Sequence, residues 1–141
     1  MKSKPITMKH LKMIHASFVV DFSFDTNITI LTGEAGTGKS MVFSFIRKYN
    51  DDERVVCINY QNQLEEIKNI IISAEGKLLI IDNADILLDD DIRKQISLDS
   101  KNQYLIIGRN PKNLFATKDN MYELVSEKNG EQIEFRIQLY L

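Results

Sequence analysis

Hydrophobic and polar positions alternate near the start of the chain, in the segment 18–24. Every second residue there is apolar, as expected for a β-strand with one buried face. The apolar residues are Phe18, Val20, Phe22 and Phe24. Residues 25–27 predict a turn, and 28–32 predict a second strand. The stretch 40–49 predicts a helix, whose apolar stripe consists of Val42, Phe43, Ile46 and Tyr49.

Apolar runs and helical patterns take turns along the middle of the chain. The predicted strands cover 54–60, 77–81 and 103–108, and the predicted helices cover 63–74 and about 89–97. Two of these strands show no polar alternation, which indicates burial on both faces, as in a parallel sheet. The acidic start of the second helix is favourable because carboxylates interact with unpaired N–H groups. Alternating strands and helices predict an α/β fold.

The C-terminal part of the chain predicts a β-hairpin. Its strands are 122–125 and 132–141, and Asn129-Gly130 is a favoured two-residue turn. The whole chain, 1–141, is expected to form one domain. The predicted fold is therefore α/β, with a mostly parallel sheet and antiparallel strands added at the N- and C-termini.

Composition and charge narrow the possible partners. Hydrophobic residues make up 43% and charged residues 27% of the chain, so a packed core is expected. Lys and Arg total 18 against 20 Asp and Glu, which gives no overall reason to expect nucleic-acid or membrane binding. Cys57 is the single cysteine, so neither an intrachain disulfide nor a cysteine-rich metal site can form. Without a signal peptide or a long apolar run, we expect a cytoplasmic protein.

The glycine-rich segment Gly33–Ser40 matches the phosphate-binding pattern G-x-x-x-x-G-K-[ST] at every position. It follows a predicted strand and opens a predicted helix, as such a loop requires. Glycines let backbone N–H groups approach phosphate oxygens, and the helix N-terminus favours anions. The expected nucleotide-binding residues are Gly33, Glu34, Ala35, Gly36, Thr37, Gly38, Lys39, Ser40 and Met41.

Two side chains of this loop have distinct expected roles. Lys39 would reach the β- and γ-phosphates, and the Ser40 hydroxyl would bind Mg²⁺. The cofactors predicted from this pattern are ATP and Mg²⁺. The alternatives are a chance match in a glycine-containing turn and a degenerate loop that no longer binds nucleotide.

A carboxylate follows the buried strand 77–81. Ligands of parallel sheets bind beyond the carboxyl ends of the strands, so Asp82 is expected near Ser40, where it would help to hold Mg²⁺. The alternative is that Asp82 only caps the following turn. Asn83 comes next, and an amide can orient a water molecule but cannot accept its proton. Asp85 is the candidate that would polarise the attacking water instead.

The strand 103–108 ends in a second pair of polar residues. Arg109 and Asn110 are expected at the same sheet edge, where they could contact the γ-phosphate or the attacking water. They could equally cap the loop before Pro111. Three other arginines remain candidates for a charge-stabilising finger, and the sequence does not choose among them: Arg47, Arg54 and Arg93.

These elements, in this order, resemble the P-loop NTPases, and within them the ATPase branch that includes AAA+ and ABC/SMC-like proteins. The resemblance covers about 28–110 and implies a three-layer sheet of order 5-1-4-3-2. The segment 18–40 is similar to the start of RecF-type ATPases. The chain departs from the family in three respects. It lacks a Leu-Ser-Gly-Gly signature, has Asn83 where a catalytic Glu is usual, and ends in a hairpin instead of a helical lid.

Three functions follow as hypotheses. The first is an Mg²⁺-dependent ATP-binding protein with slow or partner-dependent hydrolysis, in which a homo-oligomer or a partner protein completes the active site. The second is a switch or adaptor that does not hydrolyse nucleotide and whose terminal hairpin adds to the sheet edge of another chain. The third is a DNA-associated ATPase subunit, for which the charge gives no support. A GTPase is disfavoured because the guanine-reading Asn-Lys-x-Asp element is missing.

Overall fold

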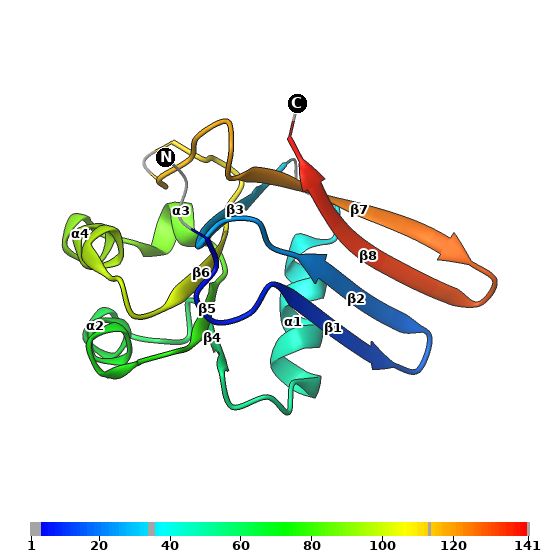
Figure 1. Cartoon of the computed structure of the whole chain (residues 1–141), viewed down its shortest axis with the longest axis horizontal. Helices are drawn as coiled ribbons and strands as arrows, with labels where there is room; N and C mark the ends of the chain where they lie inside the picture. The colour runs from blue at the N-terminus through cyan, green and yellow to red at the C-terminus, as the bar shows by residue number, and fades with distance from the viewer. Residues whose placement is uncertain (1–3, 34–35, 113, 141) are drawn as a thin grey trace.

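The structure is a computed structural model that describes residues 4–33, 36–112 and 114–140. Within these residues there are eight strands and four helices (Figure 1). In chain order they are β1 (His10–His15), β2 (Phe18–Ser23), β3 (Ile28–Thr32), α1 (Lys39–Tyr49), β4 (Val55–Ile58), α2 (Leu64–Ser73), β5 (Leu78–Ile81), α3 (Ala84–Leu87), α4 (Asp90–Leu98), β6 (Gln103–Ile107), β7 (Met121–Asn129) and β8 (Gln132–Leu139).

The fold class predicted from the sequence, a three-layer and mostly parallel P-loop NTPase sheet of order 5-1-4-3-2, is wrong. The described strands form one curled, mixed sheet in the order β1-β2-β8-β7-β3-β6-β5-β4 (Figure 1). Antiparallel pairing joins β1 to β2 and β7 to β8, whereas β2 and β8 run parallel. The four strands from the two ends of the chain therefore make up half of the sheet and lie together on one side of β3.

The C-terminal hairpin causes this difference, because it lies between β2 and β3. β7 runs parallel to β3, with Met121 opposite Ile30, and β8 runs parallel to β2, with Ile133 opposite Phe18. The two strands before the glycine-rich segment are thus separated, although strands adjacent in sequence usually pair. The edges of the described sheet are β1 and β4. The hairpin does not offer the free edge that the adaptor hypothesis needs.

The turn of this hairpin also differs from the prediction. Asn129 pairs with Gln132 across the two strands, so the central residues are Gly130 and Glu131 and not Asn129-Gly130. Gly130 has a φ of 66°, in the left-handed region that glycine adopts readily. The turn is therefore shifted by one residue.

Most of the predicted elements are confirmed within one or two residues of their expected ends. On the predicted apolar face of 18–24, Val20, Phe22 and Phe24 are buried, but Val19 on the other face is buried too, so the alternation is incomplete. The sequence analysis missed two elements, β1 and α3. In β1 only Leu11 is buried, and α3 has four residues, so neither leaves a clear periodic pattern.

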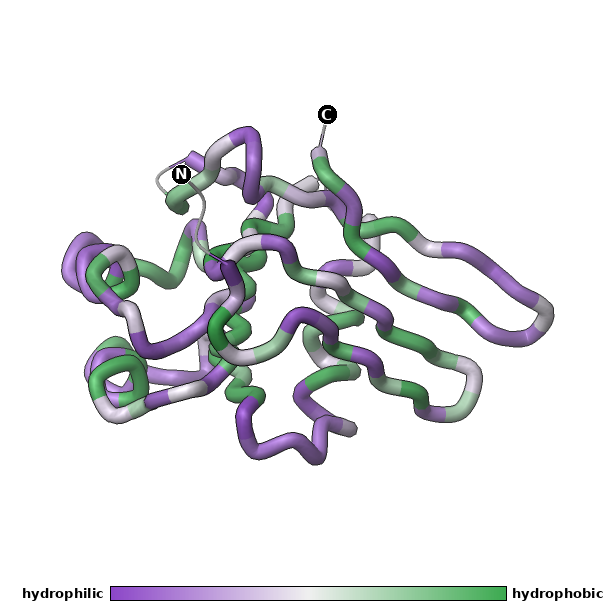
Figure 2. The backbone as a smooth tube through the Cα atoms, viewed as in Figure 1, coloured by the Kyte–Doolittle hydropathy of each residue, from purple (hydrophilic) through white to green (hydrophobic). Residues whose placement is uncertain are grey.

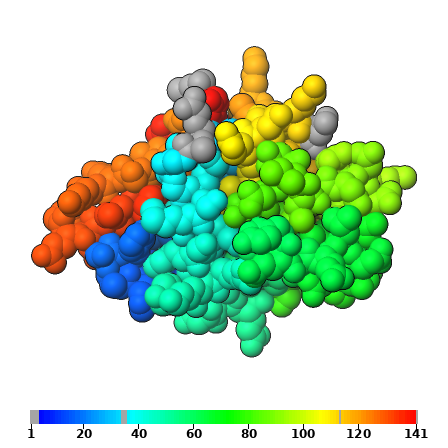
Figure 3. Space-filling view, turned by 180° about the vertical axis from the view of Figure 1, so that it is seen from behind, coloured from blue at the N-terminus to red at the C-terminus, as the bar shows by residue number. Residues whose placement is uncertain are grey.

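Two hydrophobic clusters lie on opposite faces of the sheet. The first joins α1 to the terminal strands and includes Phe43, Ile46, Phe22 and Phe135. The second joins α2 and α4 to the strands next to them and includes Ile67 and Ile92. In Figure 2 the β7–β8 hairpin alternates between hydrophobic and hydrophilic along its length, in keeping with its mixed burial. Seen from behind, α1 occupies the centre of the molecule and the β7–β8 hairpin projects to one side (Figure 3).

The N-terminal segment is fixed at the edge of the sheet where β3, β5 and β6 begin. The backbone N–H groups of Thr7 and Met8 both donate to Oε1 of the buried Gln103, at 3.0 and 2.9 Å. Ile6 N donates to Asn27 Oδ1 at 3.0 Å. Because these contacts lie far along the chain from one another, they tie the first described residues to the core. None of the helices in the described part of the chain has the length and hydrophobicity needed to cross a membrane.

Candidate phosphate-binding site

The glycine-rich loop connects the end of β3 to the start of α1. Gly33, Gly36 and Gly38 have φ values of 132°, 89° and 100°, a region that residues with a side chain rarely adopt. Glu34 and Ala35 lie outside the described residues. The first N–H groups of α1 have no acceptor within the helix, so they point toward the loop as potential anion donors. The described glycines of the loop therefore adopt conformations that glycine favours, and phosphate binding by the loop stays a prediction.

Lys39 is 7% exposed and lies inside the loop. Its Nζ donates to the carbonyl oxygen of Gly33 at 2.7 Å and to Thr37 Oγ1 at 3.2 Å. Burial is the main cause that lowers the pKa of Lys39, and the nearby Arg109 lowers it further, whereas Asp82 acts in the opposite direction. Asp85 also raises the pKa of Lys39, so two cations and two carboxylates influence one another at this point.

Asp82 follows β5 and is 6% exposed. Its Oδ1 accepts a hydrogen bond from Asn83 N at 3.0 Å, so it also caps the turn, as the alternative reading expects. Burial raises the pKa of Asp82, while the Asn83 N–H and Lys39 act to lower it. Lys39, Ser40 and Asp82 line one cavity of about 240 Å³, which we call the phosphate cavity. Ser40 and Asp82 thus line the same cavity, and their role in holding Mg²⁺ stays a prediction.

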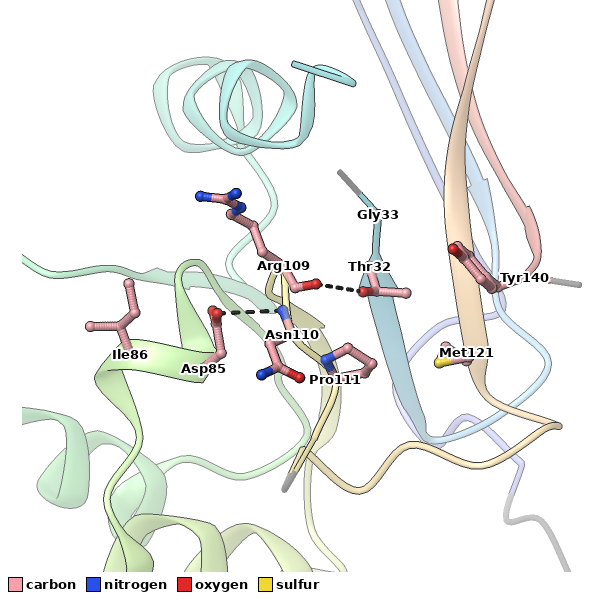
Figure 4. Close-up of a pocket in the computed structure, with 9 residues that line it drawn as sticks. All are labelled: Thr32, Gly33, Asp85, Ile86, Arg109, Asn110, Pro111, Met121 and Tyr140. Atoms are coloured by element: carbon pink, nitrogen blue, oxygen red, sulfur yellow. Dashed lines mark hydrogen bonds between the residues drawn. The ribbon is translucent and has the colours of Figure 1, made fainter. Parts of the chain in front are cut away.

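Asp85 and Asn110 line a larger neighbouring cavity of about 740 Å³ (Figure 4). Asp85 Oδ2 accepts a long hydrogen bond from Asn110 N, at 3.4 Å. Neither Asp85 nor Asn110 is among the residues that line the phosphate cavity. The catalytic roles predicted for them stay predictions, and their position is beside the phosphate cavity.

Arg109 lines both cavities. Its carbonyl oxygen accepts a hydrogen bond from Thr32 Oγ1 at 3.3 Å, and its side chain points away from Met121 and Tyr140 (Figure 4). Because the Arg109 charge lowers the pKa of Lys39, the guanidinium lies within electrostatic reach of the lysine ammonium. Arg109 thus lies beside the phosphate cavity, whereas Asn110 Oδ1 accepts a hydrogen bond from Lys112 N at 3.0 Å and so caps the loop around Pro111. A contact of either residue with the γ-phosphate stays a prediction.

The other candidate arginines are engaged elsewhere. Arg47 donates to Gln61 Oε1 at 2.7 Å, and Arg54 pairs with Asp52 at 2.8 Å. Arg93 pairs with Asp90 and also donates to the carbonyl oxygen of Leu88 at 2.6 Å. Of the four arginines singled out in the sequence, the described structure brings Arg109 to the phosphate cavity.

The close contacts that Gly108 and Gly38 make with other segments were not predicted from the sequence. A Cβ atom at Gly108 would lie 2.9 Å from Asp85 Oδ1, so only glycine lets the carboxylate approach the end of β6 so closely. A glycine at the end of a buried strand often marks such an approach, and this signal was present. A Cβ atom at Gly38 would contact Leu124 and Phe135 of the C-terminal hairpin, at 3.5 Å each. No local pattern links residues so far apart.

A third cavity, of about 480 Å³, runs along α1 beside the β1–β2 turn. Met41 lines this cavity and the phosphate cavity, so the two adjoin. The walls are mainly aromatic, with Phe18 and Phe45 on one side and a stacked His15–Tyr49 pair whose ring centroids are 3.7 Å apart. We call it the aromatic cavity.

The donor set fits a magnesium ion that shares its ligands with phosphate. Among the described residues no three His, Cys, Asp or Glu side chains come together to hold a metal. Ser40 and Asp82 supply two oxygen atoms at the phosphate cavity. Mg²⁺ commonly takes one or two protein oxygens and completes its shell with phosphate and water. The described residues are thus compatible with a metal bound together with nucleotide.

Comparisons with known proteins add no information about this site. No protein-family model matches the chain. No curated protein matches it either.

Proposed function

We propose that the chain binds ATP together with Mg²⁺ in the phosphate cavity. The observation that carries this proposal is the buried Lys39, whose ammonium lies within the glycine loop and shares one cavity with Ser40 and Asp82. A buried lysine is costly unless it meets acceptors or an anion. A triphosphate would supply such an anion, and Lys39 would exchange its loop contacts for phosphate oxygens.

Charge and backbone geometry support the same ligand class. Lys39 and Arg109 place two positive charges beside the cavity, and the start of α1 adds N–H donors. The positive φ values of Gly36 and Gly38 allow these donors to converge on phosphate oxygens. Mg²⁺ would supply charge neutralisation between the phosphates, held by Ser40 and Asp82.

The aromatic cavity is the place where the nucleoside fits. Lys39, Asp82 and Arg109 mark the end of the phosphate chain that would carry the γ-phosphate. Met41 lines both the phosphate cavity and the aromatic cavity, so a nucleotide could extend from one to the other. A base in this cavity could stack against Phe18 or Phe45. Adenine is preferred because the chain lacks a guanine-reading element.

Hydrolysis at this site would be slow or would depend on a partner. Asn83 stands beside Asp82 and carries an amide, which cannot take a proton from water. A second copy of the chain or a partner protein would supply the missing group. A cytoplasmic location stays a prediction from the sequence.

Calorimetric titration tests the binding proposal. We expect the wild type to bind MgATP and Lys39→Ala to bind at least about 100-fold more weakly, because a desolvated charge contact is removed. Lys94→Ala is the matched control, since Lys94 is an exposed helical lysine that lines neither the phosphate cavity nor the aromatic cavity. Equal affinities of wild type and Lys39→Ala would overturn the proposal.

Two further measurements separate the parts of the proposal. Tripolyphosphate should bind more weakly than ATP if the aromatic cavity holds the base, and Phe45→Ala should remove that difference. Phosphate release per protein molecule should rise with protein concentration if a second copy completes the site. Tight binding without release at any concentration would favour the switch hypothesis over an ATPase.

A further inference from the structure

Asp85 lies unusually close to the backbone at the end of β6. It stands in the first turn of α3, and its Oδ1 would be 2.9 Å from a Cβ atom at Gly108. A real Cβ essentially never comes so close to another heavy atom, so the absence of a side chain at Gly108 makes room for the carboxylate. Leu114 Cδ1 would lie 3.0 Å from the same point, which closes the other side of this contact.

Three hydrogen bonds hold the backbone of residues 108–110 in place. Gly108 N donates to the carbonyl oxygen of Leu31 at 3.1 Å, which continues the pairing of β6 with β3. Thr32 Oγ1 donates to the carbonyl oxygen of Arg109 at 3.3 Å. Asn110 N donates to Asp85 Oδ2 at 3.4 Å. The bonds to Thr32 and Asp85 lie on either side of Arg109 (Figure 4).

This arrangement differs from what a general base needs. A base must reach the proton it removes, directly or through one water molecule. One oxygen of Asp85 faces Gly108 and the other accepts from Asn110. Asp85 also lines the larger cavity and is not among the residues lining the phosphate cavity. Its contacts therefore lie on the backbone that carries Arg109.

We propose that Asp85 is a positioning residue, which holds the 108–110 backbone so that Arg109 faces the phosphate cavity beside Lys39. The effect on nucleotide binding rests on the proposed function, whereas the backbone contact does not. The proposal separates two properties of Asp85. Accepting a hydrogen bond from Asn110 is required, and a negative charge that can take a proton is not.

The substitutions Asp85→Asn and Asp85→Ala separate these two properties. Asparagine keeps an acceptor oxygen and loses the ability to take a proton, whereas alanine loses both. Each is combined with Arg109→Gln, and MgATP affinity is measured by calorimetry for all combinations. Asp89→Ala is the matched control, because Asp89 also accepts a backbone N–H bond, from Ile92 at 2.8 Å, but lines neither cavity.

The expected result is a loss of the Arg109 contribution only where the acceptor is gone. Arg109→Gln should weaken MgATP binding about tenfold in the wild type and in Asp85→Asn, as for the loss of one charge-assisted contact. In Asp85→Ala the same substitution should change affinity by less than about twofold. An unchanged tenfold effect in Asp85→Ala, the loss of that effect in Asp85→Asn, or no effect of Arg109→Gln in the wild type would each overturn the proposal.

Amide hydrogen exchange of Asn110 tests the contact without nucleotide. Exchange should be faster in Asp85→Ala than in the wild type, and unchanged in Asp85→Asn, since the asparagine oxygen still accepts the bond. If the wild type binds no MgATP, the proposed function fails, and this measurement still decides on the backbone contact. Equal exchange in all three proteins would show that Asp85 does not hold residue 110.

Discussion

The two halves of the sheet are built differently. One half, which we call the inner half, consists of β3, β4, β5 and β6. Its strands β5 and β6 are buried along their whole length, and residues Leu78 to Ile81 are 0% exposed. The other half, which we call the outer half, consists of β1, β2, β7 and β8, whose positions are partly buried and partly exposed. In β8, for example, Phe135 is the one buried residue. Continuous burial requires cover on both faces, whereas the outer strands have their apolar side mainly toward α1.

The two halves of the sheet also contribute different parts of the candidate site. Asp82 and Arg109 emerge from the carboxyl ends of the inner strands, where a buried strand fixes the backbone direction. The outer half contacts the glycine-rich loop through Leu124 and Phe135, which lie next to Gly38. The inner half therefore carries Asp82 and Arg109, and the outer half packs against the glycine-rich loop at Gly38.

The largest expected effect tests whether the inner half carries most of the stability. Ile80→Ala, at a fully buried position, should lower the free energy of unfolding by about 3–4 kcal/mol. Ile137→Ala, at a half-buried position of β8, should cost about 1–2 kcal/mol. Urea denaturation of both variants gives the comparison. Equal losses would mean that the two halves are packed equally well.

A smaller effect tests the contact between the halves. Gly38→Ala should lower the free energy of unfolding by about 1–2 kcal/mol, because a φ of 100° is unfavourable for alanine. We expect it to weaken MgATP binding as well, since the loop can no longer keep its shape over Leu124 and Phe135.

Gly76→Ala is the control for this prediction. Gly76 also has a positive φ, of 68°, but no atom lies within 4 Å of a Cβ atom there. It should lose stability and keep wild-type affinity for MgATP in calorimetry. If Gly38→Ala also kept that affinity, the hairpin would have no role in shaping the loop.

The smallest effect concerns a polar contact at the start of the inner half. Asp99 Oδ2 accepts hydrogen bonds from Tyr104 Oη at 2.5 Å and from Asn102 Nδ2 at 2.9 Å. Burial alone would raise the pKa of Asp99, but these bonds and the N–H of Lys101 outweigh it and lower the pKa. Asp99→Asn should therefore cost about 1 kcal/mol at neutral pH.

The pH dependence of this loss follows from the direction of the shift. A carboxyl with a lowered pKa in the folded state stabilises the protein above its unfolded pKa of about 4. That stabilisation disappears as the pH falls below this value and through the lower folded pKa. Thermal unfolding should thus show wild type and Asp99→Asn converging at acidic pH. The exposed Asp119→Asn should follow the wild type throughout, and a constant difference would contradict the assignment.

Local patterns were sufficient to predict all the described elements except β1 and α3, but not the order of the strands in the sheet. The runs at 77–81 and 103–108 predicted buried strands because their hydrophobicity is continuous. The insertion of the hairpin depends on contacts between Phe18 and Ile133, more than a hundred residues apart, and no periodicity records such a pairing. A family resemblance carried by the loop then supplied a sheet order that the structure does not have.

The site shows the same limit. Gly33–Ser40 could be predicted because its spacing is local and chemically specific. Asp85 was predicted from its distance to Asp82 in the sequence, which does not tell which way a side chain turns. Its direction depends on the missing side chain of Gly108 and on the bond to Asn110, which both follow the end of β6.

The N-terminal contacts limit how far the protein can be shortened. The buried Gln103 receives its two backbone donors from Thr7 and Met8. Deleting the chain up to and including Met8 would leave that oxygen without them, at a cost of about 1–3 kcal/mol. A fluorescent label is better placed at the neighbouring Glu131, which is exposed and does not need the positive φ that favours glycine at position 130. Such a label would sit at the tip of the same hairpin whose base supports the glycine loop.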